Sequence, residues 1–66
     1  MSDKRIAQEC YDKVLKYFKG DDKKAWYWFE HATPGLGGVS PLDMIKRGRV
    51  KKLLLYIDNL LEGNHP

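Results

Sequence analysis

The chain has 66 residues and a formal net charge of +3, from 12 lysines and arginines against 9 aspartates and glutamates. This length predicts one domain over residues 1–66, and a charge this modest is more typical of solubility than of an anionic partner. No stretch reaches the ~20 apolar residues of a membrane span, and the start lacks the apolar core of a signal peptide, so we expect a cytoplasmic protein without a membrane partner.

The first predicted helix covers residues 3–19. At about 100° per residue, its apolar side chains fall on one half of the helical circumference. They are Ile6, Ala7, Cys10, Tyr11, Val14, Leu15, Tyr17 and Phe18. This pattern indicates a surface helix packed on a core, and Gly20 is its stop signal.

The second predicted helix begins with an aspartate cap at residue 21 or 22 and ends before Pro34, because the residue ahead of a proline avoids helical geometry. Its apolar face contains Ala25, Trp26, Trp28, Phe29 and Ala32. We expect Trp28 and Phe29 in the core, Trp26 at its edge and Tyr27 in solvent.

A loop with the sequence ATPGLGGV follows at residues 32–39, and we expect its one leucine, Leu36, to insert into the core. The third helix opens with Ser40 as its cap and Pro41 at its first position. It is short, since Gly48 ends it. Leu42 and Ile45 are predicted to face inward.

The fourth predicted helix runs over residues 49–62 and closes at Gly63. Its apolar stripe contains Val50, Leu53, Leu54, Ile57, Leu60 and Leu61. Tyr56 flanks this stripe, and Leu55 falls on the opposite face. No alternating pattern predicts a strand, so the expected fold is all-α, a small domain of four helices.

No motif in the chain predicts catalysis. The sequence GLGG lacks both a preceding strand and a following Gly-Lys-Ser/Thr, so Gly37 and Gly38 are better explained by a tight turn with positive φ. His31 and His65 have neither zinc spacing nor a catalytic partner, and Cys10 is expected to be a buried, inert thiol. We therefore expect no metal, no cofactor and no enzymatic activity.

A basic cluster lies at the junction of the last two predicted helices. It contains Lys46, Arg47, Arg49, Lys51 and Lys52. These side chains are possible phosphate contacts, which would make the chain a small nucleic-acid-binding protein. The alternative is a solvated helix junction, because acidic residues follow on the same helix and no aromatic residues are interleaved.

The string WFEHATPGLGGVSPLDMIKRGRV resembles the toxin-binding domain of Xre/MbcA/ParS-type bacterial antitoxins. The matching positions are Trp28, Phe29, Pro34, Leu36, Gly37, Gly38, Ser40, Pro41, Leu42, Ile45 and Gly48. The resemblance covers residues 21–63 and leaves 64–66 as a tail. Only one helix precedes the motif, so we expect the chain to lack the family's usual N-terminal helix-turn-helix.

The resemblance implies a protein that binds and inhibits a NAD-degrading toxin of the RES fold, in part with its C-terminal end, and that forms a homodimer. A phage or mobile-element inhibitor that uses the same fold on a host protein is an alternative. An exposed leucine and tyrosines also favour an interface. The expected partner-binding residues are Arg49, Lys52, Leu55, Tyr56, Asn64, His65 and Pro66.

Overall fold

The computed structural model describes residues 2–62, and these residues form four α-helices and one short 3-10 helix. The elements are α1 (Asp3–Tyr17), α2 (Asp22–Glu30), η1 (Pro34–Leu36), α3 (Pro41–Lys46) and α4 (Val50–Leu61). Over this range there is no strand beyond an isolated bridge between Thr33 and Val39. The predicted all-α fold with four helices is therefore confirmed. Gly63 and the tail, Asn64, His65 and Pro66, lie outside the described residues.

The first three α-helices begin at side-chain caps. Ser2 Oγ accepts from the Arg5 N–H (3.3 Å), Asp21 Oδ1 from the Lys24 N–H (3.2 Å), and Ser40 Oγ from the Asp43 N–H (3.1 Å). The predicted Ser40 cap with Pro41 behind it is confirmed, and Asp21 is the cap of α2. Each cap satisfies a backbone donor that the first helical turn leaves without a partner.

The helices are shorter than the sequence pattern predicts. Helix α1 ends at Tyr17 because both Lys19 (φ 57°) and Gly20 (φ 83°) are left-handed, and the Gly20 N–H donates back to Leu15 O (2.8 Å). Helix α2 ends at Glu30, because His31 has an extended backbone conformation. Two residues later the Thr33 N–H donates to Val39 O (3.1 Å) and not to a carbonyl of the helix. Gly48 ends α3 as expected, in the left-handed region (φ 74°).

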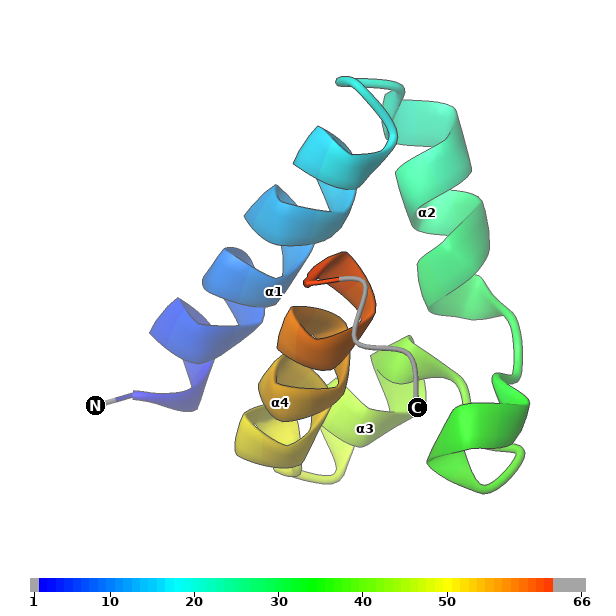
Figure 1. Ribbon diagram of the computed structural model, residues 1–66. Helices are drawn as coiled ribbons and strands as arrows, with labels where there is room; N and C mark the ends of the chain where they lie inside the picture. The colour runs from blue at the N-terminus through cyan, green and yellow to red at the C-terminus, as the bar shows by residue number, and fades with distance from the viewer. Residues whose placement is uncertain (1, 63–66) are drawn as a thin grey trace.

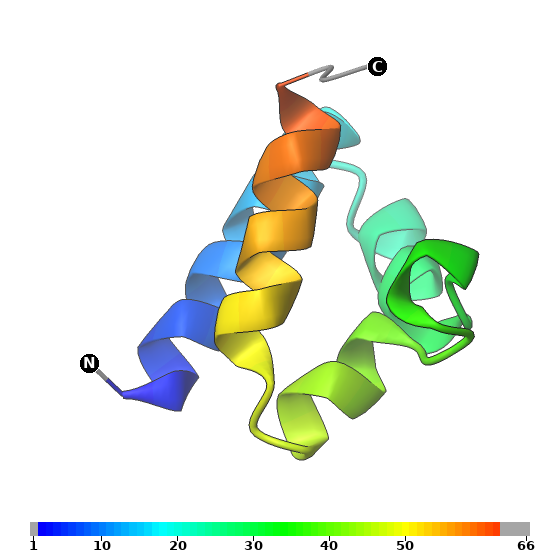
Figure 2. The same ribbon diagram turned by 60° about the horizontal axis from the view of Figure 1, so that its bottom comes forward.

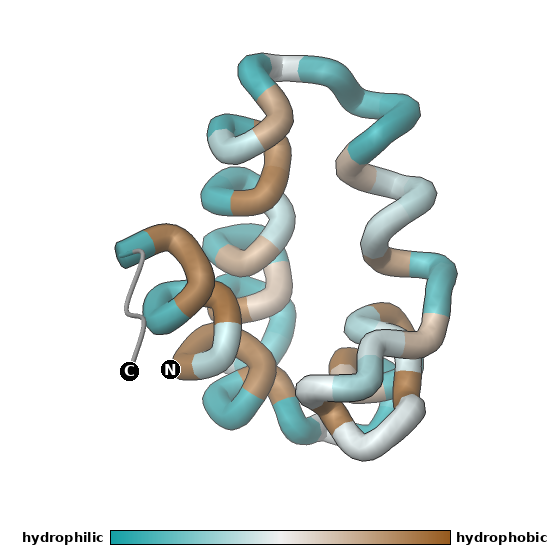
Figure 3. Tube along the Cα trace, turned by 45° about the vertical axis from the view of Figure 1, so that its right-hand side comes forward, coloured by the Kyte–Doolittle hydropathy of each residue, from teal (hydrophilic) through white to brown (hydrophobic). Residues whose placement is uncertain are grey.

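Helices α1 and α4 lie side by side and pack against each other more extensively than any other pair of helices. Helix α2 leaves the end of α1 at an angle, and η1 and α3 lead from the end of α2 to α4 (Figures 1 and 2). Hydrophobic and hydrophilic residues alternate around α1 and α4 (Figure 3). An ion pair joins these two helices, because Lys13 Nζ lies 2.5 Å from Asp58 Oδ1 and 3.5 Å from Glu9 Oε2. The hydrogen bond to Asp58 is the main cause of the raised pKa of Lys13.

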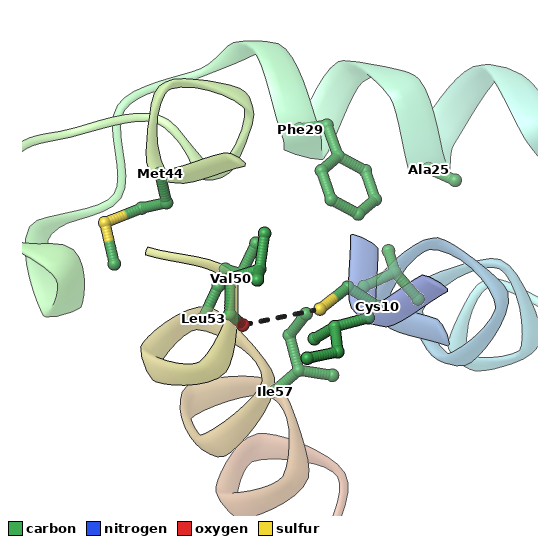
Figure 4. Packing of buried hydrophobic residues seen from close by; sticks show 9 residues of the cluster. Cys10, Ala25, Phe29, Met44, Val50, Leu53 and Ile57 are labelled. Carbon is green, nitrogen blue, oxygen red and sulfur yellow. Dashed lines mark hydrogen bonds between the residues drawn. The ribbon is translucent and has the colours of Figure 1, made fainter. Parts of the chain in front are cut away.

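The core lies where all four α-helices meet. Its buried members are Ile6, Cys10, Val14, Ala25, Phe29, Met44, Val50, Leu53 and Ile57. Phe29, Val50, Leu53 and Ile57 point toward one another around Cys10, whose Sγ lies 4.0 Å from Val50 O (Figure 4). Burial of this apolar surface is the main favourable contribution to folding, and it offsets the conformational entropy that the chain loses when it folds.

The predicted core needs three corrections. Trp28 and Leu36 are only half-buried and pack on the rim of the core, with Phe29 at its centre. In α3 the buried residues are Pro41 and Met44, while Leu42 and Ile45 are half-buried, because the short helix presents a face turned by about one residue from the one predicted.

The third correction concerns helix ends. Tyr17, Leu60 and Leu61 belong to the predicted apolar faces but are exposed, and all three lie in the last turn of α1 or α4. The membrane-span prediction is a separate point: among the described helices, none combines the length and the hydropathy that a membrane crossing needs.

Candidate functional site

A groove of about 360 Å³ lies between the loop around η1, the end of α3 and the outer face of α4. We call it the basic groove, and Figure 2 shows the three segments that form it. Its lining residues are Gly35, Leu36, Val39, Met44, Arg47, Arg49, Lys52, Leu55, Tyr56 and Asn59. They come from three segments that the chain brings together only on folding.

The floor of the basic groove is apolar. Leu36 and Val39 are half-buried, and Met44 connects the floor to the core. Leu55 stands on this floor with 62% of its surface exposed. A large exposed apolar side chain within a concave apolar surface is typical of a binding site.

Gly35 and Tyr56 make the closest approach in this groove. A Cβ atom on Gly35 would lie 2.6 Å from Tyr56 Cε1 and 2.7 Å from Tyr56 Oη, so the tyrosine ring lies directly against the backbone of η1. The sequence predicted the special glycines at Gly37 and Gly38. Both do have positive φ, 77° and 80°, but Gly35 is the one that a side chain of α4 contacts.

The rim of the groove is cationic. Arg47, Arg49 and Lys52 are exposed and line it, and no aspartate or glutamate does. Between residues 2 and 62, both ion pairs involve Lys13, so none of these three cations has a carboxylate partner there. The groove therefore combines apolar surface with uncompensated positive charge.

Four of the residues predicted to bind a partner, Arg49, Lys52, Leu55 and Tyr56, line this one groove. The other three, Asn64, His65 and Pro66, lie outside the described residues. Of the predicted phosphate contacts, Arg47, Arg49 and Lys52 line the groove, whereas Lys46 and Lys51 are exposed elsewhere.

Sequence patterns gave no indication that Val39, Met44 and Asn59 would join this site. Val39 reaches the groove because the Thr33–Val39 bridge folds the loop back on itself. Met44 takes its place through the rotation of α3 described above. The only usable signal for Gly35 was its position in a glycine-rich loop.

A second groove, of about 430 Å³, lies between α1, α2 and α3. Its walls include Ala7, Tyr11, Trp26, Phe29, Leu42 and Ile45. The Tyr11 hydroxyl donates a hydrogen bond to Asp22, and the Tyr11 ring contacts those of Trp26 and Phe29. Lys4 is its only charged lining residue.

Cys10 and His31, the cysteine and histidine outside the basic groove that the structure describes, show no arrangement that would support catalysis. Cys10 is buried, as predicted, and burial raises the pKa of its thiol from 9.0 to about 11. His31 is exposed, stacks on Tyr27 with ring centroids 3.8 Å apart, and donates from Nδ1 to Tyr27 O (2.6 Å). Across residues 2–62 no three His, Cys, Asp or Glu side chains come close enough to hold a metal ion.

The fold and this site define a small all-α domain with an apolar groove edged by cations. Comparisons of the chain with protein-family models, curated proteins and solved structures found no match.

Proposed function

We propose that the chain is a non-catalytic docking module that binds and inhibits another protein through the basic groove. The observation that carries the proposal is Leu55, an exposed leucine in a groove that is also lined by apolar side chains and by three cations, Arg47, Arg49 and Lys52. Interfaces are built from central apolar anchors with polar groups around them, and this groove has that composition.

The resemblance in the sequence supplies the most specific candidate partner, a RES-type toxin that degrades NAD. Inhibition needs no chemistry from the chain, because a bound domain that covers the mouth of an active site excludes the substrate. The tail residues Asn64, His65 and Pro66 are proposed to extend this contact. A host protein is the alternative partner for the same surface, and a homodimer is a further proposed assembly.

Co-expression tests this function directly. The chain is expressed with a RES-type toxin from the genome that encodes it, and growth and cellular NAD are measured. Neutralisation restores both. Affinity of the purified pair is then compared for Leu55→Ala and for Leu60→Ala, which truncates another exposed leucine of α4 that does not line the groove.

We expect Leu55→Ala to weaken binding at least about tenfold, which corresponds to roughly 1.4 kcal/mol. The control should change it less than about twofold on the same scale. Deletion of residues 63–66 should weaken binding and leave the helical circular-dichroism signal unchanged. A toxin that binds neither the chain nor its variants would contradict the antitoxin proposal.

Nucleic acid binding is the second candidate, and it is favoured by the exposed cations Arg47, Arg49 and Lys52, which have no carboxylate partner within residues 2–62. Its affinity would fall steeply with salt, because each neutralised phosphate releases counterions. A mobility-shift assay with duplex DNA and single-stranded RNA at two salt concentrations separates the two functions. Absence of a shift at low salt removes this candidate.

A further inference from the structure

The start of α4 differs from the start of every other α-helix in the described chain. Helices α1, α2 and α3 each have a side-chain cap and an aspartate in the first turn. Helix α4 has neither, and Arg49, Lys51 and Lys52 occupy its cap and first turn. Cations at the positive end of a helix dipole destabilise the helix, so this arrangement is unfavourable for the isolated domain.

Two of these cations border apolar surface. Arg49 and Lys52 line the basic groove together with Arg47, and Lys52 lies one helical turn before the exposed Leu55. A ligand that brought carboxylates to the rim would relieve the repulsion at the start of α4. The same ligand would need an apolar side chain to cover Leu55 and the floor beside Leu36.

We propose that the basic groove holds an acidic segment of a partner protein, in which a leucine-sized side chain lies between aspartates or glutamates. This inference rests on the proposed function, because it takes the groove to be a protein-docking surface, and it adds the chemistry of the segment that binds there.

A nucleic acid fits the same surface less well. Its backbone presents a phosphate at every nucleotide, whereas the groove has three cations beside a larger apolar lining that includes Leu36, Val39 and Leu55. Two further cations that a phosphate backbone would use, Lys46 and Lys51, do not line the groove. The apolar floor and the three rim cations together favour a segment that is both aliphatic and anionic.

The test uses two synthetic peptides that differ only in charge. Both carry leucines one helical turn apart, with glutamates beside them in the first peptide and lysines in the second. Each is titrated to millimolar concentration into the ¹⁵N-labelled full chain, and backbone amide shifts are followed. We expect the glutamate peptide to shift the amides of Leu36, Val39 and Leu55, and the lysine peptide to bind at least tenfold more weakly.

A charge-reversal variant gives the decisive measurement. Arg49→Asp with Lys52→Glu should reverse the preference, so that the lysine peptide binds more tightly than the glutamate peptide. The matched control is Lys23→Glu with Lys24→Glu, which makes the same change in formal charge in the first turn of α2, outside the groove. It should keep the original preference. Circular dichroism checks that each variant folds.

Several outcomes would overturn the inference, four of them in the peptide and nucleic-acid titrations. The first is equal affinity for both peptides, and the second is amide shifts confined to the groove around Trp26 and Ile45. The third is a charge-reversed variant that still prefers the glutamate peptide. The fourth is binding of duplex DNA or RNA but of no peptide. Concentration-dependent sedimentation that Leu55→Ala abolishes would assign the groove to a second copy instead.

The toxin experiment and the peptide experiment distinguish failure of the proposed function from failure of this inference. If the peptides bind as expected and the RES-type toxin does not bind, the partner is wrong and the chemistry of the groove stands. If the toxin binds wild type and the charge-reversed variant equally, docking occurs on another surface and this inference is wrong.

Discussion

Gly35 and Tyr56 connect the loop after α2 to the outer face of α4 through one contact. The φ of Gly35 is outside the left-handed region, so an alanine could adopt its backbone conformation. The missing side chain is needed for space, because the Tyr56 ring occupies the position of a Cβ atom. This contact joins two of the segments that line the basic groove.

Gly35→Ala should therefore destabilise the domain by about 1–3 kcal/mol, the usual cost of overpacking. In a Tyr56→Ala background the same substitution should be neutral or stabilising by about 0.4–1 kcal/mol, since alanine restricts the unfolded chain more than glycine does. Urea unfolding of the four proteins in this double-mutant cycle measures the coupling. Additive effects would show that the ring does not lie against Gly35.

Cys10 predicts a pH dependence of stability. Burial, with the negative charges of Glu9 and Asp58, raises the pKa of the folded thiol to about 11, whereas an unfolded thiol titrates near 9.0. Above pH 9 the unfolded chain loses this proton first, so stability is complete below pH 9 and falls as the pH rises to about 11. The urea midpoint of wild type should drop more steeply over this range than that of Cys10→Ala, and parallel curves would contradict the shift.

The same burial makes Cys10 a poor nucleophile, because the thiolate is the reactive form. Its position on the apolar face of the first helix was enough to predict this from the sequence. For Trp28 the same reasoning was wrong. Adjacent aromatic residues on a helix point about 100° apart, so small differences in packing decide which one occupies the core centre.

At the level of the elements, sequence patterns located all four α-helices, and the caps of α2 and α3, more reliably than the last residue of each helix. Ser40, Pro41 and Gly48 have strong local preferences, and the structure uses each as predicted. The ends of α1 and α2 were overestimated because backbone hydrogen bonds of the following turn and bridge compete with further helix. Those bonds depend on tertiary position, which periodicity alone does not contain.

The unusual start of α4 gives a prediction about stability that is separate from binding. Arg49→Asp places an N-cap residue at α4, and Lys52→Glu places an acid three positions later, as in a capping box. The double variant should be more stable than wild type by about 1 kcal/mol, through the cap and the helix dipole. Thermal unfolding measures this, and a lower melting temperature would mean that the cations at this position stabilise the fold.

For the whole molecule, the rotation of α3 and the composition of the basic groove were beyond sequence reasoning. The cations and Leu55 were recognised as unusual one at a time, but their convergence with Val39 and Gly35 depends on how the loop after α2 folds against α4. Patterns within a helix predict which face is buried. They do not predict which neighbouring segment completes a surface.

Because the core is small, we expect truncation of two neighbouring aromatic residues, Phe29 and Trp28, to reduce the free energy of unfolding by clearly different amounts. Phe29→Ala should cost about 3–5 kcal/mol, which approaches the whole stability of a domain of this size. Trp28→Ala should cost clearly less, because Trp28 is half-buried at the rim. Far-ultraviolet circular dichroism at room temperature should show loss of helical signal for the first variant only. The reverse order would place Trp28 at the centre after all.

The Thr33–Val39 bridge has a consequence for recognition. Leu36, Gly37 and Gly38 donate back to Pro34 O or Thr33 O at 2.9–3.1 Å, so the turn is closed by its own backbone. If the groove binds a partner segment as we propose, that segment would meet a preformed wall at Leu36 and Val39. The conformational entropy of this wall would already have been lost during folding and not during binding. Loosening the turn closed by the Thr33–Val39 bridge, without changing any residue that lines the groove, should then slow association with such a segment more than it speeds dissociation.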